Sequence, residues 1–386
     1  MFPTKHLEKF SQTDTPFYYY DKQLLIQTLE SLNKSKPKNY TVHYALKANS
    51  NIEILKLIRE HNIGADCVSG NEVKRAVECG FHNNEIVFAG VGKSDVEINY
   101  ALDHDIFCFN VESIPELSVI NQLASQKNKV ARIALRINPN VDAYTHKYIT
   151  TGLEENKFGI NPYEFDEVLG VLKNLKNLQF IGLHFHIGSQ INDLKPYKNL
   201  CTRVNEINKW FISKGFLLEV INVGGGLGID YQEPDKNAIV DFDSFFKVFV
   251  QFLELEPSQK VHFELGRALV GQCGSLISRV LYVKKGINTN FAILDAGMTE
   301  LIRPALYQAY HKIENISSGF LKRTNEKIEK YDVVGPICES SDCFGKAVEL
   351  KSCNRGDLIA IRSAGAYGEV MSSQYNLRDQ VKSYFF

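Results

Sequence analysis

Residues 44–49 read Tyr-Ala-Leu-Lys-Ala-Asn and lie where a strand pattern gives way to a helix pattern. Tyr44 and Leu46 alternate as in a buried strand, and apolar residues at helical spacing follow within 52–58. The stretch therefore predicts a strand that delivers one lysine, Lys47, to its end. A lysine in that position can lose solvation, and desolvation lowers the pKa of an ammonium group and makes the amine nucleophilic. A surface lysine that merely ends a strand is the other interpretation.

The same alternation of strand and helix continues to about residue 265. Short apolar runs predict eight strands, at 41–46, 64–69, 86–90, 106–109, 130–137, 179–185, 218–223 and 260–264. Helical patterns are expected near 22–33, 51–61, 71–79, 94–102, 114–126, 162–174, 196–214 and 241–255. This order predicts an α/β fold in which eight parallel strands close into a TIM-like (β/α)8 barrel. An open doubly wound sheet is the second possibility.

The alternation of strand and helix patterns ends after residue 266. Strand patterns then follow one another without helices, at 275–284, 290–295, 331–336, 346–350 and 357–363. We expect a barrel domain of residues 22–266 and a mostly β domain of residues 267–386 joined by residues 1–21. Residues 138–159 show no clear element, and long irregular loops in compact domains are usually functional.

Composition excludes several classes of function. The chain has 386 residues, 44% of them hydrophobic and 23% charged, which is ordinary for a soluble globular protein. A net charge of -1 leaves no electrostatic footprint for nucleic acid or anionic membrane. Neither a signal peptide nor a membrane-spanning run is recognisable, so we expect a cytoplasmic protein. Eight cysteines without a CxxC pair indicate reduced thiols rather than disulfides or zinc ligands.

Polar residues gather at the carboxyl ends of the predicted barrel strands, where barrel enzymes carry their active sites. They are Lys47, Asp66, Ser69, Arg136, His184, His186, Gly188, Ser189, Gly224 to Gly228, Glu264, Gly266 and Arg267. This convergence predicts a single active site at that end of the barrel.

Three of these groups indicate which ligand the site could bind. The glycine run 224–228 could present backbone N–H groups to a phosphate, although an ordinary turn has the same composition. His184 and His186 have no carboxylate or cysteine at ligand spacing, so stacking on an aromatic cofactor or burial in the core is favoured over a metal site. Glu264 could keep the ring nitrogen of a pyridine aldehyde protonated, or it could pair with Arg267.

Further motifs connect the chain with a known family. Together with residues 44–49 they are RINPNVDAYTHKYITTGLEENKFGI (136–160), HFHIGSQI (184–191), GGGLGIDY (224–231), ELGR (264–267), RPALY (303–307), CESSD (338–342) and GAYGEVMSSQYN (365–376). In this order, over roughly residues 15–380, they resemble the diaminopimelate decarboxylases. That family uses pyridoxal 5'-phosphate (PLP) and combines a barrel with a β domain.

The resemblance implies a role for each matching residue around the cofactor. Lys47 is the expected Schiff-base lysine, His186 would stack on the pyridine ring, and Glu264 would pair with the ring nitrogen. The phosphate group would be held by Ser189, Gly224, Gly225, Gly226, Gly266 and the backbone of Arg267, together with Tyr367.

The resemblance also implies a substrate site and a homodimer. The distal carboxylate would be bound by Arg267, Arg303 and Tyr307, and the distal ammonium group by Glu339, while Tyr367 would also contact the substrate. Cys338 would be the proton donor, and it would reach the site with Glu339 from the partner subunit. Two departures are small: Leu265 replaces the usual proline of EPGR, and Leu46 replaces the usual valine of YAVKAN.

The expected reaction is PLP-dependent decarboxylation of meso-2,6-diaminopimelate to L-lysine and CO2, the last step of lysine biosynthesis. A decarboxylase of ornithine, arginine or carboxynorspermidine is the nearest alternative, and Arg303 disfavours it because such substrates are cationic at the distal end. A racemase of this fold has an arginine where Glu264 stands. A non-catalytic regulatory homologue would be expected to have lost Lys47, Glu264 or Cys338.

Overall fold

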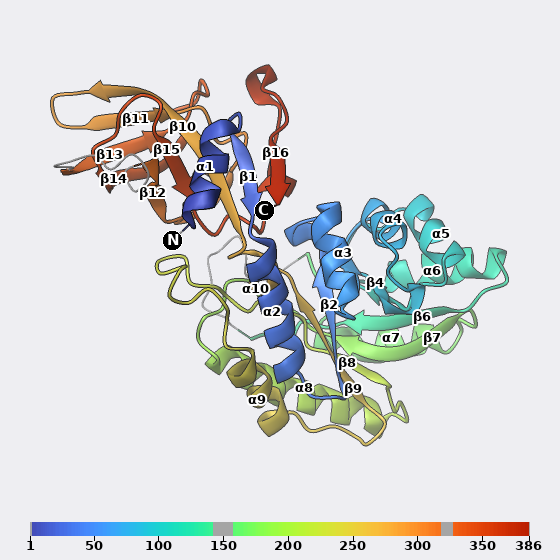
Figure 1. Cartoon of the computed structure of the whole chain (residues 1–386). Helices are drawn as coiled ribbons and strands as arrows, with labels where there is room; N and C mark the ends of the chain where they lie inside the picture. The colour runs from blue at the N-terminus through green and yellow to red at the C-terminus, as the bar shows by residue number, and fades with distance from the viewer. Residues whose placement is uncertain (1, 142–156, 318–326, 386) are drawn as a thin grey trace. The chain divides into compact units, whose positions relative to one another are not determined.

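The computed structural model describes residues 2–141, 157–317 and 327–385, so most of the predicted loop 138–159 lies outside the described residues. The chain divides into two compact units, which Figure 1 shows in ribbon form. The barrel unit comprises residues 29–228 and 241–266, and the sheet unit comprises 1–28, 229–240 and 267–386. This division differs from the predicted domain limits only in where residues 22–28 and 229–240 are placed.

Eight parallel strands close into a barrel in the barrel unit. They are β2 (Tyr40–Ala45), β3 (Gly64–Cys67), β4 (Ile86–Phe88), β5 (Cys108–Val111), β6 (Ala131–Arg136), β7 (Leu178–His184), β8 (Val220–Asn222) and β9 (Lys260–Leu265). The first strand pairs with the last, with Tyr40 opposite Val261, so the sheet has no free edge. The predicted barrel is thereby confirmed, and the open sheet is excluded.

Helices alternate with these strands. They are α2 (Lys22–Ser35), α3 (Ile52–Glu60), α4 (Gly70–Glu78), α5 (Asp95–Asp103), α6 (Ile114–Gln126), α7 (Phe165–Leu172), α8 (Lys195–Ser213) and α9 (Phe242–Phe252). Short 3-10 turns lie at η1 (Leu46–Ala48), η2 (Asn83–Glu85) and η3 (Pro162–Glu164). Neighbouring helices α4, α5 and α6 pack side by side on the outside of the strands (Figure 1). Within the described ranges, no helix is long and apolar enough to cross a membrane.

Helix α3 shows how the sequence sets these elements. The side chain of Asn51 caps the helix by accepting a hydrogen bond of 3.0 Å from the backbone N–H of Glu53. Ile54, Leu55 and Ile58 repeat at helical spacing and are fully buried. The helix therefore begins directly after the Lys47 segment and holds it against the barrel through its apolar face.

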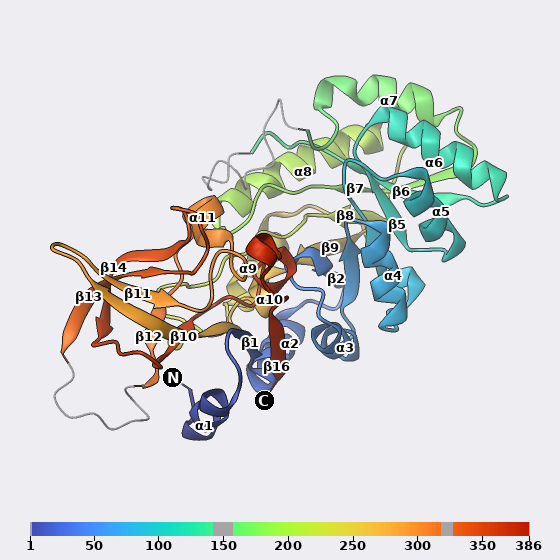
Figure 2. The same ribbon diagram turned by 90° about the horizontal axis from the view of Figure 1, so that it is seen from above.

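The sheet unit contains an eight-stranded sheet with the order β12-β15-β10-β11-β13-β14, in which β1 also pairs with β10 and β16 pairs with β1 (Figure 2). Its strands are β1 (Phe17–Tyr20), β10 (Gly274–Lys285), β11 (Asn290–Leu294), β12 (Ile313–Asn315), β13 (Ile328–Val334), β14 (Cys343–Lys351), β15 (Leu358–Ile361) and β16 (Lys382–Phe385). Its helical elements are α1 (Thr4–Gln12), α10 (Arg267–Val270), α11 (Arg303–Tyr307), η4 (Glu369–Met371) and η5 (Tyr375–Leu377).

The five strands predicted after residue 266 are all present, whereas α1, β12 and β16 were not predicted, and the short helices α10 and α11 correct the expectation of a segment without helices. Phe10 from α1 packs with Phe17 and Tyr19 from β1 in one buried cluster. The rings of Phe10 and Tyr19 meet edge to face with 4.9 Å between their centroids. The N-terminal segment is therefore part of the core of the sheet unit.

A buried histidine pair links the first and last barrel strands. Nδ1 of His43 lies 3.0 Å from the carbonyl oxygen of Glu85, and Nε2 lies 3.0 Å from Nδ1 of His262. Since the carbonyl requires Nδ1–H on His43, its Nε2 accepts from His262, and both imidazoles are neutral. Burial lowers the pKa of His43, and burial together with the nearby His43 lowers that of His262 further. Both histidines therefore charge readily only when the chain unfolds.

This pair predicts a loss of stability in mild acid. Because the unfolded histidines titrate near pH 6.5 and the folded ones below it, the unfolded state binds more protons as the pH falls. Each histidine then costs about 1.4 kcal/mol of unfolding free energy per pH unit below 6.5. Urea unfolding at pH 7.5 and 5.5 should show a smaller pH effect in His43→Asn than in the wild type. An equal pH effect in His43→Asn and in the exposed control His82→Asn would contradict this.

Candidate active site

Lys47 lies in η1, directly after strand β2, with Leu46 and Ala48 buried on either side. The residue itself is exposed, so the predicted desolvation of its amine by the chain is wrong. Its charge nevertheless acts on the barrel interior, where it lowers the pKa values of Glu264 and His186. The amine therefore stands at the carboxyl end of the barrel strands, within electrostatic reach of both groups.

Glu264 lies near the end of β9, and only 7% of the residue is exposed. Its Oε1 accepts hydrogen bonds from the side-chain amides of Asn110, at 3.0 Å, and Asn222, at 2.8 Å. Its Oε2 lies 3.0 Å from Nε2 of His184. Burial alone would raise the pKa of Glu264, but His184 and the positive charge of Lys47 outweigh it and hold that pKa well below its usual range. The carboxylate is therefore ionised and keeps lone pairs for one more donor.

The two predicted histidines have different roles. His184, the last residue of β7, faces Glu264 and helps to hold it. His186 lies two residues beyond the strand, and its Nδ1 accepts a hydrogen bond of 3.4 Å from the backbone N–H of Gly225. Burial lowers the pKa of His186 well below its usual value, and the cations Lys47 and Arg136 lower it further. His186 is thus a neutral, flat ring beside the glycine loop, and the described residues contain no cluster that could hold a metal ion.

The glycine loop after β8 needs glycine for steric reasons. Gly224 and Gly226 have φ values of +71° and +93°, which side chains rarely tolerate. A Cβ atom on Gly225 would collide with the carbonyl oxygen of Glu264. The loop therefore packs its backbone directly against the end of β9, and Ser189 precedes the isolated bridge between Ile191 and Leu227 that ties the two loops together.

Three other polar residues at strand ends have either a partner in the barrel unit or no hydrogen-bond partner. Ser69 caps helix α4 by accepting from the backbone N–H of Glu72 at 3.2 Å. Arg136 forms a buried ion pair of 2.7 Å with Glu112. Both carboxylate oxygens of Asp66 are buried without a hydrogen-bond partner, and burial raises its pKa well above the usual value.

The sheet unit brings together most of the predicted carboxylate-binding residues. Arg267 and Arg303 are each 6% exposed, and each donates an Nη1–H to the hydroxyl of Tyr231, at 2.5 Å and 3.0 Å. The guanidinium of Arg267 also lies over the ring of Tyr367, 4.9 Å from its centroid. Tyr307 is the last residue of α11, which begins at Arg303, and Gly266 directly precedes Arg267.

Cys338 and Glu339 are both exposed and lie on a turn that other side chains fix. The backbone N–H of Cys338 donates to Oδ1 of Asn376 at 3.1 Å, and the hydroxyl of Tyr375 donates to Oε1 of Glu339 at 2.8 Å. Asn376 holds a φ of +55°, a left-handed conformation that asparagine tolerates better than most residues.

Sequence analysis did not find Asn110, Asn222, Tyr231 or His311. The two asparagines lie at strand ends, which is a signal that could have been used. The roles of Tyr231 and His311 come from contacts with Arg303, 72 and 8 residues away along the chain, although Tyr231 ends the quoted motif 224–231.

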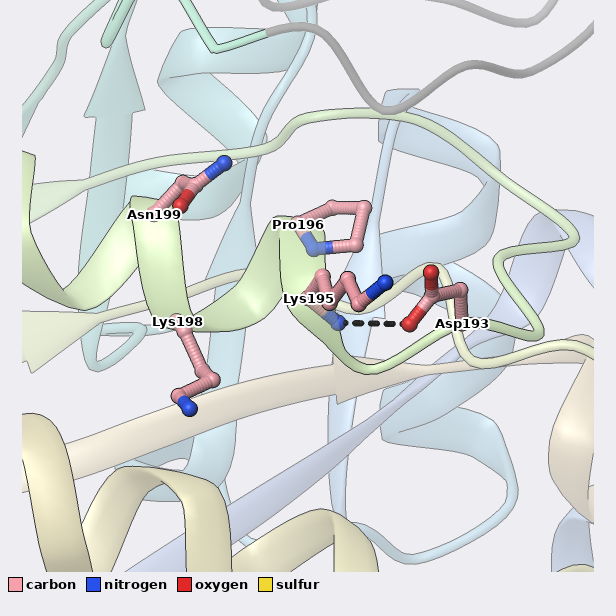
Figure 3. Close-up of a pocket in the computed structure, with 5 residues that line it drawn as sticks. All are labelled: Asp193, Lys195, Pro196, Lys198 and Asn199. Atoms are coloured by element: carbon pink, nitrogen blue, oxygen red, sulfur yellow. Dashed lines mark hydrogen bonds between the residues drawn. The ribbon is translucent and has the colours of Figure 1, made fainter.

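A hollow of about 350 Å³ on the barrel unit involves none of these residues. Asp193, Lys195, Pro196, Lys198 and Asn199 line it at the start of α8 (Figure 3). Asp193 accepts a hydrogen bond of 2.9 Å from the backbone N–H of Lys195, as the dashed line in Figure 3 marks. The aspartate is thus used in beginning the helix.

The sequence profile described as "Pyridoxal-dependent decarboxylase, pyridoxal binding domain" matches residues 23–271. The chain belongs to the pyridoxal-dependent decarboxylases. This membership confirms the resemblance seen in the sequence, and the family's cofactor is PLP. The match covers the barrel strands, the glycine loop and Glu264.

Relatives within this family cover nearly the whole chain. The diaminopimelate decarboxylase of Bacteroides thetaiotaomicron is 60% identical over 98% of this chain and 97% of its own length. That of Helicobacter pylori is 43% identical over 97% of this chain and 91% of its own. The crystal structure of the H. pylori enzyme complexed with L-lysine superposes with a TM-score of 0.91, at 41% identity, over 99% of this chain and 94% of that one.

The steric fit of the glycine loop predicts that Gly225→Ala is damaging. The added methyl group must displace the carbonyl of Glu264, and such overpacking typically costs about 1–3 kcal/mol. We expect a lower melting temperature and weaker retention of PLP, measured by its absorption after dialysis. Gly170→Ala in α7, where a Cβ meets nothing within 4 Å, should leave both unchanged or slightly raise stability. Equal behaviour of the two variants would contradict this packing.

Proposed function

We propose that the protein decarboxylates meso-2,6-diaminopimelate to L-lysine and CO2. The observation that carries this proposal is the ionised Glu264, held by the side chains of Asn110, Asn222 and His184 at the end of the barrel where Lys47 also stands. The relative that is 60% identical over nearly the whole chain bears the name of this activity. Decarboxylation of another basic amino acid is the weaker candidate, because a pair of guanidinium groups disfavours a cationic distal end.

The barrel residues fit PLP. Glu264 has lone pairs left for a pyridinium N–H, and no side chains shield the backbone of the loop from Gly224 to Gly226. We assign the phosphate group to this loop with Ser189, Gly266, the backbone of Arg267 and Tyr367. His186 supplies the neutral ring face, and Lys47 the amine that carries the cofactor.

Each residue of the proposed site has its own role in the reaction. PLP, when bound, supplies the electron sink for the pair of electrons left behind when CO2 departs. Glu264 keeps a proton on the ring nitrogen, because its own low pKa makes it the weaker base. Lys47 would carry the cofactor, and the thiol of Cys338 would supply the proton for the α-carbon from which CO2 has left. The net change replaces one C–C bond by a C–H bond.

The distal end of the substrate distinguishes diaminopimelate from simpler amino acids. Arg267, Arg303, Tyr307 and Tyr367 are assigned to the carboxylate that remains in L-lysine, and Glu339 to the distal ammonium group. Guanidinium groups suit this task because they are always charged and present parallel N–H donors.

We also propose a homodimer in which Cys338 and Glu339 serve the site of the partner subunit. Three features support it: both residues are exposed, a left-handed segment around Asn376 fixes them, and the nearby Leu377 is 97% exposed. Sedimentation that finds an active monomer would contradict it. A cytoplasmic location is supported by the eight cysteines, which are all described and all free thiols.

The activity can be tested with purified PLP-loaded protein and a panel of meso-diaminopimelate, ornithine, arginine and carboxynorspermidine. We expect CO2 and L-lysine from diaminopimelate alone. Glu264→Gln should lower kcat by about 100-fold or more, because a neutral amide cannot hold a proton on the ring nitrogen.

Glu254→Gln is the matched control, since this exposed glutamate pairs only with the exposed Lys209 at the surface and should keep full activity. Release of CO2 from another substrate of the panel, or full activity of Glu264→Gln, would overturn the proposal.

A further inference from the structure

Arg303 is a buried cation without an acidic partner. All its hydrogen bonds within the described residues run from Nη1 to neutral groups, the hydroxyl of Tyr231 and Nε2 of His311 at 2.8 Å. Burial lowers the pKa of Arg303, as expected for a charge whose solvation is not replaced. A buried guanidinium with such neighbours is costly unless an anion joins it, so its surroundings point to a ligand.

His311 fixes the orientation of Arg303. Its Nδ1 lies 2.9 Å from the carbonyl oxygen of Arg362, so Nδ1 carries the hydrogen and Nε2 is left to accept from Arg303. Burial and the adjacent cation Arg303 lower the pKa of His311 to about 3. The imidazole therefore stays neutral, and it directs one N–H of Arg303 without adding to or cancelling the charge.

Tyr231 connects the two guanidinium groups. Its hydroxyl oxygen accepts an N–H from Arg267 and another from Arg303, and its ring stands edge to face with that of His311 at 5.2 Å. A phenol that accepts two hydrogen bonds still has its own proton to donate. No acceptor for that proton is found among the described residues, so the O–H is available to a ligand near both cations.

We propose that Tyr231 and His311 complete a preset carboxylate receptor with the two arginines. In it, Tyr231 donates its hydroxyl proton directly to the substrate carboxylate, and His311 is a positioning residue that holds Arg303 toward the same anion. The inference deepens the proposed function, because the anion it names is the carboxylate retained in L-lysine. Preset donors avoid the entropy cost of ordering two long side chains on binding.

Binding rather than turnover tests the receptor. L-Lysine and 1,5-diaminopentane differ only in the carboxylate, so calorimetric titration of each into the PLP-loaded protein isolates the contribution of that group. Tyr231→Phe should weaken L-lysine binding roughly 10- to 100-fold, the usual worth of a hydrogen bond to a charged group, and leave 1,5-diaminopentane unchanged. The exposed neighbour Tyr310→Phe is the matched control and should bind both ligands as the wild type does.

The positioning role of His311 is tested by substitution and rescue. His311→Leu should weaken L-lysine binding about 10-fold and raise KM for diaminopimelate with kcat nearly unchanged, because the amine and the ring nitrogen are untouched. His311→Gln, whose amide oxygen can still accept from Arg303, should recover most of this loss. A purely structural role would instead lower the melting temperature and weaken both ligands together.

The outcomes separate this inference from the proposed function. An unchanged preference for L-lysine over 1,5-diaminopentane in Tyr231→Phe and His311→Leu overturns the receptor, even if diaminopimelate is decarboxylated. Loss of that preference supports the receptor, even if another reaction of the family proves to be the activity. If inorganic phosphate weakens the binding of L-lysine as strongly as simple carboxylates do, the receptor is a general anion site. That result would also overturn the assignment.

Discussion

The barrel depends on one buried carboxylate and the three side chains that hold it. Glu264 on β9 is reached by Asn110 from β5, His184 from β7 and Asn222 from β8. Since β5 and β9 are not neighbours in the barrel, these contacts must cross its interior. A buried charge is tolerated only when it is fully hydrogen-bonded, so the ionisation of Glu264 fixes which polar residues these strands can carry.

The barrel interior contains further polar residues beside Glu264. Barrels of this kind are usually filled with branched apolar side chains, but here the neutral pair of His43 and His262 lies beside Glu264 on β2 and β9. His262 also stacks on Phe107, with 5.4 Å between ring centroids. The interior thus contains two sets of hydrogen-bonded polar side chains, one around Glu264 and one formed by His43 and His262. Such buried polar sets favour a unique arrangement of the strand ends over maximal hydrophobic burial.

The sheet unit also contains a buried charge, the guanidinium group of Arg303. Arg303 is buried among neutral partners, so its charge is left for a ligand rather than satisfied within the unit. In the barrel unit, by contrast, the buried anion Glu264 accepts hydrogen bonds from Asn110 and Asn222, and His184 and Lys47 lower its pKa. Each unit thus holds one buried charge by hydrogen bonds, Glu264 in the barrel unit and Arg303 in the sheet unit.

Much of this arrangement could be predicted from the sequence. The strand ends are marked by short apolar runs followed by Lys47, His184, the glycine loop and Glu264, because alternation and turn chemistry are local properties. The strand-end positions of Asn110 and Asn222 were a usable signal, but their common partner Glu264 lies far away along the chain, as Arg303 does from Tyr231. The expected desolvation of Lys47 failed for the same reason: burial is a property of the folded surroundings and not of the flanking residues.

The central claim is that Glu264 stays ionised and therefore keeps a proton on the cofactor's ring nitrogen. Nitrogen-15 NMR of the protein loaded with PLP labelled at that nitrogen measures this directly. The account predicts the chemical shift of a pyridinium, unchanged from pH 6 to pH 9, and a shift toward neutral pyridine in Glu264→Gln. A neutral pyridine signal in the wild-type protein at pH 7 would contradict it.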